Sequence, residues 1–162
     1  MIAHVPVKVT DEDALLTAAE NPGWKVERDQ SGQLVMTPPP GGESARRNSR
    51  LTRLLDEWAE ANDFISFDSN GGFRLADSSI VAPDGALVGR ASWNALSEED
   101  REGIVPLAPD VAVELCSKTD EPIKLQAKLE RLLSAGTAYV VLIDPYRKTI
   151  WDRGTRPRGF DL

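Results

Sequence analysis

The stretch of chain from residue 110 to residue 144 constrains the fold more than any other. It opens with the strand-like run 111–115, passes through leucines at helical spacing, and closes with the nearly all-apolar run 139–143. A run of this last kind is typical of a strand that is covered on both faces. Two strands joined through a helix form a crossover connection, so we expect them to be parallel and near neighbours in one sheet.

The rest of the chain predicts further helices and a hairpin around this unit. Residues 11–20 and 43–62 favour helices, and a short helix begins at Ser97, where the sequence resembles a capping box. Residues 24–28 and 33–37 predict a hairpin. Further strands are expected at residues 64–68, 72–75, 79–88 and 148–152. The pattern predicts an α/β or α+β fold with a mixed central β-sheet, flanking helices and an N-terminal β-hairpin.

The length of the chain fits one domain. It has 162 residues, of which 41% are hydrophobic, and a chain of this size buries a full core without disulfides or structural metal. We therefore expect a single domain over residues 1–162, with a core at 24–152. Residues 153–162 are rich in Gly, Pro and Arg, so we expect a loosely ordered tail there.

The side chains that a reaction could use are few. Cys116 is the only cysteine and His4 the only histidine, which excludes a disulfide framework, a zinc cluster and a histidine-based triad. Catalysis would have to use carboxylates, lysines, hydroxyls or a bound ion. The first ten residues lack the pattern of a signal peptide, and no apolar run approaches the roughly 20 residues of a membrane span. We expect a cytoplasmic protein that does not enter a membrane.

Two carboxylates lie within apolar, strand-like runs, where burying a charge costs free energy. Glu114 is at the centre of the 111–115 strand, between Val113 and Leu115, and Asp84 follows Pro83 in the apolar run 79–88. A carboxylate in a core strand needs a partner charge, hydrogen bonds or a metal. If their strands are neighbours, Asp84 and Glu114 make a site for a hard divalent cation.

The charge of the chain bears on its partners. A net charge of −7 argues against nucleic-acid binding through a broad basic surface, although it leaves room for a local basic cleft. Two groups of basic residues could line such a cleft, or could simply be solvated faces of helices. They are Arg46, Arg47, Arg50 and Arg53 in one helix, and Lys118, Lys124, Lys128 and Arg131 after the Glu114 strand.

Six separated blocks of the sequence resemble the Uma2 family, in that family's order. These bacterial proteins are grouped with the restriction-endonuclease-like, or PD-(D/E)xK, nucleases. The resemblance covers residues 24–151. The blocks are Pro38 to Ser44, Gly71 to Leu75, Ala82-Pro83-Asp84, Ala108 to Ser117, Leu125 to Leu129, and Leu142 to Pro145.

The resemblance implies a restriction-endonuclease-like core in which Asp84 and Glu114 bind Mg²⁺ or Mn²⁺. Glu43 matches an acidic residue that can complete the metal site. The usual lysine two positions after the second acid is replaced by Cys116, and the position that matches a migrated lysine is Lys128.

The chemistry of the candidates adds detail to this expectation. The carbonyl of Leu115 follows Glu114 on the same strand and is a further candidate ligand. Lys128 would orient or help to deprotonate the attacking water, and a lysine beside a metal should have a lowered pKa. Lys118 is the reserve candidate for this role, and Leu132 stands where the family often has an aromatic residue. The predicted function is a divalent-metal-dependent endonuclease acting on nucleic acid, most readily DNA, as a homodimer.

Other interpretations remain open at this point. Asp84 could end a strand, Glu114 could be solvated on an edge strand, Lys128 could be surface charge, and Glu43 could favour a helix dipole. The protein would then be a catalytically inactive nuclease-like module that acts through a protein partner. A third possibility is a structural dimer whose interface holds Trp93, Trp151 and Phe160.

Overall fold

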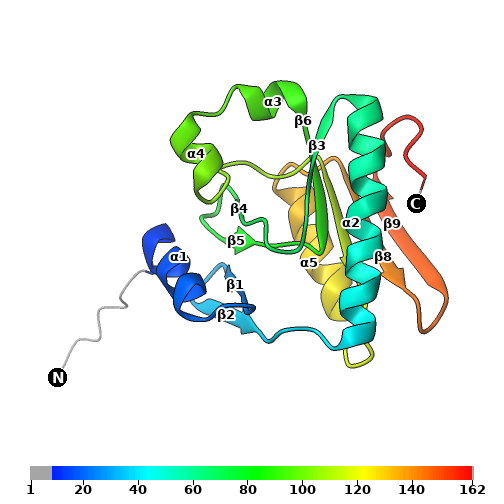
Figure 1. The fold of residues 1–162 in the computed structure, drawn as a ribbon, viewed down its shortest axis with the longest axis horizontal. Helices are drawn as coiled ribbons and strands as arrows, with labels where there is room; N and C mark the ends of the chain where they lie inside the picture. The colour runs from blue at the N-terminus through cyan, green and yellow to red at the C-terminus, as the bar shows by residue number, and fades with distance from the viewer. Residues whose placement is uncertain (1–8, 162) are drawn as a thin grey trace.

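The computed structural model describes residues 9–161, so His4 lies outside the described residues. Figure 1 shows the helices and strands packed in layers, with the long helix α2 crossing the front. In chain order the elements are α1 (Asp11–Glu20), β1 (Lys25–Arg28), β2 (Leu34–Thr37), α2 (Gly42–Asn62), β3 (Phe64–Phe67), β4 (Phe73–Arg74), β5 (Ile80–Val81), β6 (Gly85–Gly89), α3 (Arg90–Asn94), α4 (Glu98–Glu102), β7 (Val111–Leu115), α5 (Pro122–Ser134), β8 (Tyr139–Asp144) and β9 (Thr149–Gly154).

A mixed sheet with helices on both faces forms the centre of the described chain. Its strand order is β3-β6-β7-β8-β9, and only β7 and β8 run parallel. The predicted crossover unit is therefore confirmed: α5 connects β7 to β8, and Glu114 is level with Leu142. The predicted mixed sheet with flanking helices is confirmed as well.

The alternation of side chains along β7 decides which helix each of them meets. Val111 and Val113 pack with Leu51 and Leu55 of α2. Ala112 faces the other way, in the cluster that contains Leu129 and Leu132 of α5. Because side chains alternate along a strand, Glu114 points to the same face as Ala112 and lies under α5 rather than in solvent. Its side chain is buried, so the alternative of a solvated edge carboxylate is wrong.

A second, antiparallel sheet lies beside the first within residues 9–161, with the strand order β2-β1-β5-β4. It contains the expected hairpin of β1 and β2, in which Lys25 pairs with Thr37. The expected strand at residues 79–88 is divided into β5 and β6, and these belong to different sheets. Pro83 lies at this break, where a residue without an N–H cannot continue a ladder.

An ion-pair group ties α1 to the second sheet. Asp11 accepts from the buried Arg28 at 2.7 Å and also pairs with Arg74. The guanidinium of Arg28 further donates to the carbonyls of Val9 and Ser78, both at 2.9 Å. The start of α1 is fixed at the predicted residue, since Thr10 caps it through a capping box.

Part of the segment expected to be loosely ordered is packed. Strand β9 extends to Gly154, and the side chain of Phe160 is 3% exposed. The ring of Phe160 lies edge-on to Trp58, with centroids 5.1 Å apart, and to Tyr139 at 5.9 Å. Phe160 is therefore a core residue here, which removes it from the suggested dimer interface. No helix within residues 9–161 is long and apolar enough to cross a membrane.

Candidate active site

Two strands of the mixed sheet bring the predicted carboxylates together. Strands β6 and β7 are antiparallel, with Gly85 level with Val113, so Asp84 just before β6 is adjacent to Glu114 on β7. The Oδ2 atom of Asp84 accepts a hydrogen bond from the backbone N–H of Leu115 at 2.9 Å. The break at Pro83 therefore places Asp84 beside Glu114 rather than within a continuous strand.

Helix α5 adds Lys128 to this pair. Its buried residues Leu129 and Leu132 face the sheet, and Lys128 precedes Leu129 on the side of Glu114. The Nζ atom of Lys128 lies 2.6 Å from Oε1 of Glu114 and 2.9 Å from Oε1 of Glu27. Lys128 is thus a partly buried lysine held between two carboxylates, and not surface charge.

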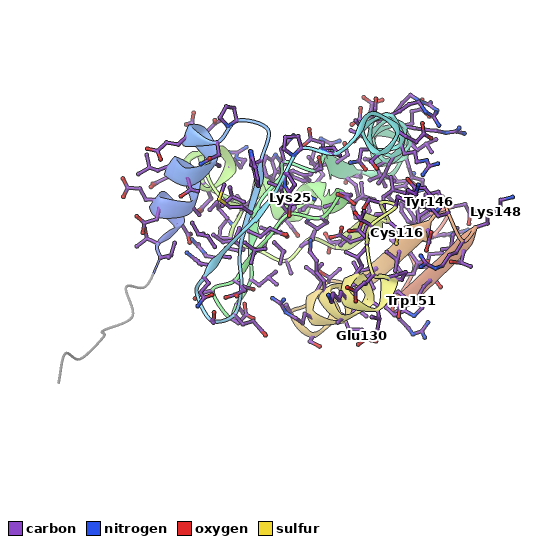
Figure 2. All side chains as sticks on the ribbon, turned by 90° about the horizontal axis from the view of Figure 1, so that it is seen from below. Lys25, Cys116, Glu130, Tyr146, Lys148 and Trp151 are labelled. Atoms are coloured by element: carbon purple, nitrogen blue, oxygen red, sulfur yellow. The ribbon has the colours of Figure 1, made fainter. Side chains whose placement is uncertain are left out.

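Lys25 and Glu27, which the sequence pattern does not single out, complete the cluster from β1. Lys25 Nζ lies 2.9 Å from Asp84 Oδ1, and Glu27 Oε1 accepts from the backbone N–H of Ala82 at 2.7 Å. In Figure 2, Lys25 lies between α1 and Cys116, the residue after β7. The sequence feature that could have identified Lys25 and Glu27 is their spacing, since positions two apart on a strand share a face.

The electrostatics of the cluster follow from burial and from the two lysines. Burial raises the pKa of Glu114 to about 7, even though the Lys128 ammonium acts in the other direction. Burial also acts to raise the pKa of Asp84, but Lys25 and the Leu115 N–H hold that pKa below its ordinary value. Asp84 is therefore ionised at neutral pH, while Glu114 is close to its point of titration.

The lowered Lys128 pKa expected beside a bound metal stays a prediction, and the metal-free cluster has the opposite direction. Burial favours the neutral amine, yet the carboxylates of Glu114 and Glu27 outweigh burial and raise the pKa of Lys128. Lys128 is accordingly an ammonium ion at neutral pH.

Glu43 and Leu115 are the other two predicted metal ligands, and within residues 9–161 neither has the contact that was predicted for it. Glu43, in the first turn of α2, is exposed and pairs with Arg46 at 2.8 Å and Arg47 at 3.0 Å. No contact between Glu43 and the cluster is recorded among the described residues, so its role as a ligand stays a prediction. Leu115 meets Asp84 through its N–H; its carbonyl as a ligand also stays a prediction.

Three further residues singled out from the sequence are placed as follows. Lys118 is exposed in the turn after β7. Cys116 is buried, and burial raises the pKa of its thiol to about 11, so it is an unreactive core residue. Leu132 is fully buried in the core under α5, so it has no surface to offer a substrate.

The cluster fits a hard divalent cation. Asp84 and Glu114 offer carboxylate oxygens, the donors that Mg²⁺ and Mn²⁺ prefer. Oε1 of Glu114 is buried and has no hydrogen-bond donor within the described residues, because Lys128 approaches it closely but without hydrogen-bond alignment. A buried carboxylate oxygen needs a positive partner, which here is Lys128 and could also be a cation. No set of three acidic, histidine or cysteine side chains arranged for a metal occurs within residues 9–161.

The fold is similar to that of a solved structure from Anabaena variabilis, described as a "putative nuclease belonging to DUF820". The superposition has a TM-score of 0.65 at 19% sequence identity and covers 82% of this chain and 73% of the other. The mixed sheet with flanking helices is therefore the fold of a protein described as a putative nuclease. The chain belongs to the Uma2 family, whose model, described as "Putative restriction endonuclease", matches residues 11–151.

A curated protein shares part of the sequence. It is a "Solute-binding protein" of Chromohalobacter salexigens, 32% identical over 80 residues. The match covers 46% of this chain but only 23% of that protein, so this chain spans less than a quarter of the relative's length.

Proposed function

We propose that this protein is a divalent-cation-dependent endonuclease that hydrolyses phosphodiester bonds, with DNA as its substrate. The observation that carries the proposal is the meeting of Asp84, Glu114 and Lys128 from three separate elements. A buried carboxylate pair beside an ammonium ion is a costly arrangement, and costly charged groups concentrate at functional sites.

The two carboxylates would hold the cation, with the Leu115 carbonyl as a further ligand. The cation would activate a water molecule and polarise the scissile phosphate. Asp84 is fixed for this task by the Leu115 N–H, and Glu114 is fixed by the sheet on one side and α5 on the other.

Lys128 would act as a fixed positive charge. Its pKa is raised in the metal-free cluster, so it carries a proton there at neutral pH. It can orient the attacking water and stabilise the negative charge that develops on the phosphoryl oxygens. Glu27 holds this ammonium from the second sheet.

A strand of DNA would reach the site across the start of α2 and the end of β8. Arg47 of α2 lies over the ring of Tyr146, 4.7 Å from its centroid, and Tyr146 is 41% exposed. Arginine and aromatic side chains together bind phosphates and bases.

Cutting both strands of a duplex would require two copies of the site, so we propose a homodimer, which sedimentation velocity tests.

The test is titration of the protein with Mn²⁺ and Mg²⁺ by calorimetry, combined with cleavage of plasmid DNA, single-stranded DNA and RNA. We expect binding and cleavage in the wild type and loss of both in Glu114→Ala, with Glu130→Ala, an exposed glutamate of α5, as the matched control. Full cleavage by Glu114→Ala would end the assignment.

A second function is favoured by the ion pairs themselves. Asp84 and Glu114 each already face a lysine, so the cluster is close to neutral without a cation. A nuclease-like module that acts through a protein partner would have this property. Intact folding without Mn²⁺ or Mg²⁺ binding would support it over the nuclease.

A further inference from the structure

Lys25 belongs to the carboxylate–lysine cluster and also borders a separate cavity. Its ammonium contacts Asp84, with 18% of the side chain exposed. Lys25 is also among the residues that border a cavity of about 390 Å³ between α1, β1, the β3–β4 loop and α4. Lys25 therefore stands between an open space and the carboxylates.

The cavity is large enough for a small ligand or for part of a larger one. It is lined mainly by small and apolar residues, with Trp24 among them, and Trp24 is 41% exposed. Ala82, two residues before Asp84, also borders it. Lys25 therefore connects the border of this space with the proposed cation site.

The net charge of the cluster, compared with and without a divalent cation, suggests a role for Lys25 in binding phosphate. With every group ionised, Asp84, Glu114 and Glu27 together with Lys25 and Lys128 have a net charge of −1. A divalent cation changes this to +1, which matches the single negative charge of a phosphodiester. Without Lys25 the cation-bound cluster would have no net charge and would attract the phosphate more weakly.

Asp84 and Glu114 would then hold the cation, and Asp84 would no longer need the Lys25 ammonium as its partner charge. The ammonium and a divalent cation compete for the carboxylate, and the cation has the larger charge. The Lys25 ammonium, on a flexible stem, would then be free to bind an oxygen of the incoming phosphate.

We propose that Lys25 is a phosphate-binding residue of this site, which neutralises Asp84 in the cation-free protein and contacts a non-bridging oxygen of the DNA backbone when a cation occupies Asp84 and Glu114. The inference rests on the proposed nuclease function and extends it from α5 and the mixed sheet to β1.

Two measurements on Lys25→Met and Lys25→Arg test the proposal, with Lys124→Met, an exposed lysine of α5, as the control. The first is calorimetric titration with Mn²⁺ in the absence of DNA. Lys25→Met should bind Mn²⁺ several times more tightly than the wild type, because the competing ammonium is gone. Weaker Mn²⁺ binding by Lys25→Met would overturn the proposal, since Lys25 would then support the carboxylates.

The second measurement is the affinity for a fluorescent DNA oligonucleotide in Ca²⁺, with the integrity of the DNA checked on a gel. Lys25→Met should bind DNA about tenfold to a hundredfold more weakly, as expected for one hydrogen bond between charged groups. The slope of log affinity against log salt should fall by about one contact, and Lys25→Arg should restore it. Wild-type affinity and slope in Lys25→Met would overturn the proposal.

These outcomes separate the two proposals. A wild type that binds no Mn²⁺ would overturn the nuclease function and this inference together. A wild type that binds Mn²⁺ and cuts DNA, combined with unchanged DNA binding in Lys25→Met, would overturn the role of Lys25 alone. Lys25→Gln removes the same charge with a polar end group and replaces Lys25→Met if the circular dichroism of the latter differs from the wild type.

Discussion

The carboxylate of Asp84 accepts a hydrogen bond at 2.9 Å from the backbone N–H of Leu115, the residue that follows Glu114. This contact joins the break between β5 and β6 to the end of β7. It fixes the spacing of the two proposed cation ligands through the backbone, so the geometry of the site depends on the packing of the whole sheet.

Two replacements of Asp84 should distinguish its hydrogen bond to the Leu115 N–H from its proposed role as a cation ligand. Asp84→Asn keeps an oxygen that can accept from the Leu115 N–H, so we expect near wild-type stability but Mn²⁺ affinity lowered at least ~100-fold, because carboxylate charge dominates such sites. Asp84→Ala also removes the acceptor and should cost about 1–3 kcal/mol more. Calorimetry and urea unfolding measure both effects, and unchanged Mn²⁺ binding by Asp84→Asn would exclude this residue as a ligand.

Lys128 and Lys118 should differ sharply in their effect on cleavage. Lys128 contacts Glu114, whereas Lys118 is exposed in the turn after β7. Lys128→Met should lower kcat for DNA cleavage about a hundredfold or more with little change in KM, because it removes a charge that acts on the transition state. Lys118→Met should stay close to the wild type, and the reverse order of these two variants would reassign the catalytic lysine.

Gly85, directly after Asp84, should tolerate no side chain without a change in α2. A Cβ at this position would lie 2.4 Å from Cδ1 of the fully buried Leu55. We expect Gly85→Ala to lower the free energy of unfolding by about 1–3 kcal/mol through overpacking. Leu55→Ala should cost less in that background than in the wild type, because the new methyl group fills part of the cavity. Additive effects in a double-mutant cycle would show that the two sites do not touch.

The stability of the α1 attachment should depend on pH through Asp11. Burial acts to raise the pKa of Asp11, but the guanidinium groups of Arg74 and Arg28 hold it below the ordinary value of 3.8. A lowered folded-state pKa stabilises the protein above pH 3.8, and this contribution is lost as the pH falls through the lowered pKa. Asp11→Asn should therefore cost about 1 kcal/mol at pH 7, and the difference should shrink below pH 3.8. Urea unfolding at several pH values measures this, and the exposed Glu12→Gln is the control; a gap that stays constant down to pH 3 would contradict the ion-pair account.

Phe160 should contribute as much to the free energy of unfolding as a residue in the interior of the chain, although it is residue 160 of 162. Its ring is buried against Trp58 and Tyr139. Phe160→Ala should lower the free energy of unfolding by about 3 kcal/mol, while the exposed Arg158→Ala should have little effect. Equal stability of both variants in thermal unfolding would mean that the tail does not pack in solution.

The sequence by itself determined the elements and the nature of the chemistry. Cap and turn residues predicted α1 and the hairpin of β1 and β2, and the spacing of apolar residues predicted the crossover from β7 through α5 to β8, because these signals are local properties of the sequence. The apolar residues around Glu114 also favoured a carboxylate that needs a partner, although a solvated carboxylate on an edge strand fitted the same pattern. The resemblance to the Uma2 family added the link between Asp84, Glu114 and Lys128.

Only the tertiary structure decided which elements meet. The run at residues 79–88 is a strand by its local pattern, yet Pro83 divides it between two sheets. Lys25 joins Asp84 across 59 positions of sequence, and Glu27 joins Lys128 from a strand of the other sheet. Such contacts depend on how strands pair and helices pack over the whole molecule, and no local spacing encodes them. For the same reason Phe160 has a place in the core and the Lys128 pKa is raised, since both result from neighbours that are distant in the chain.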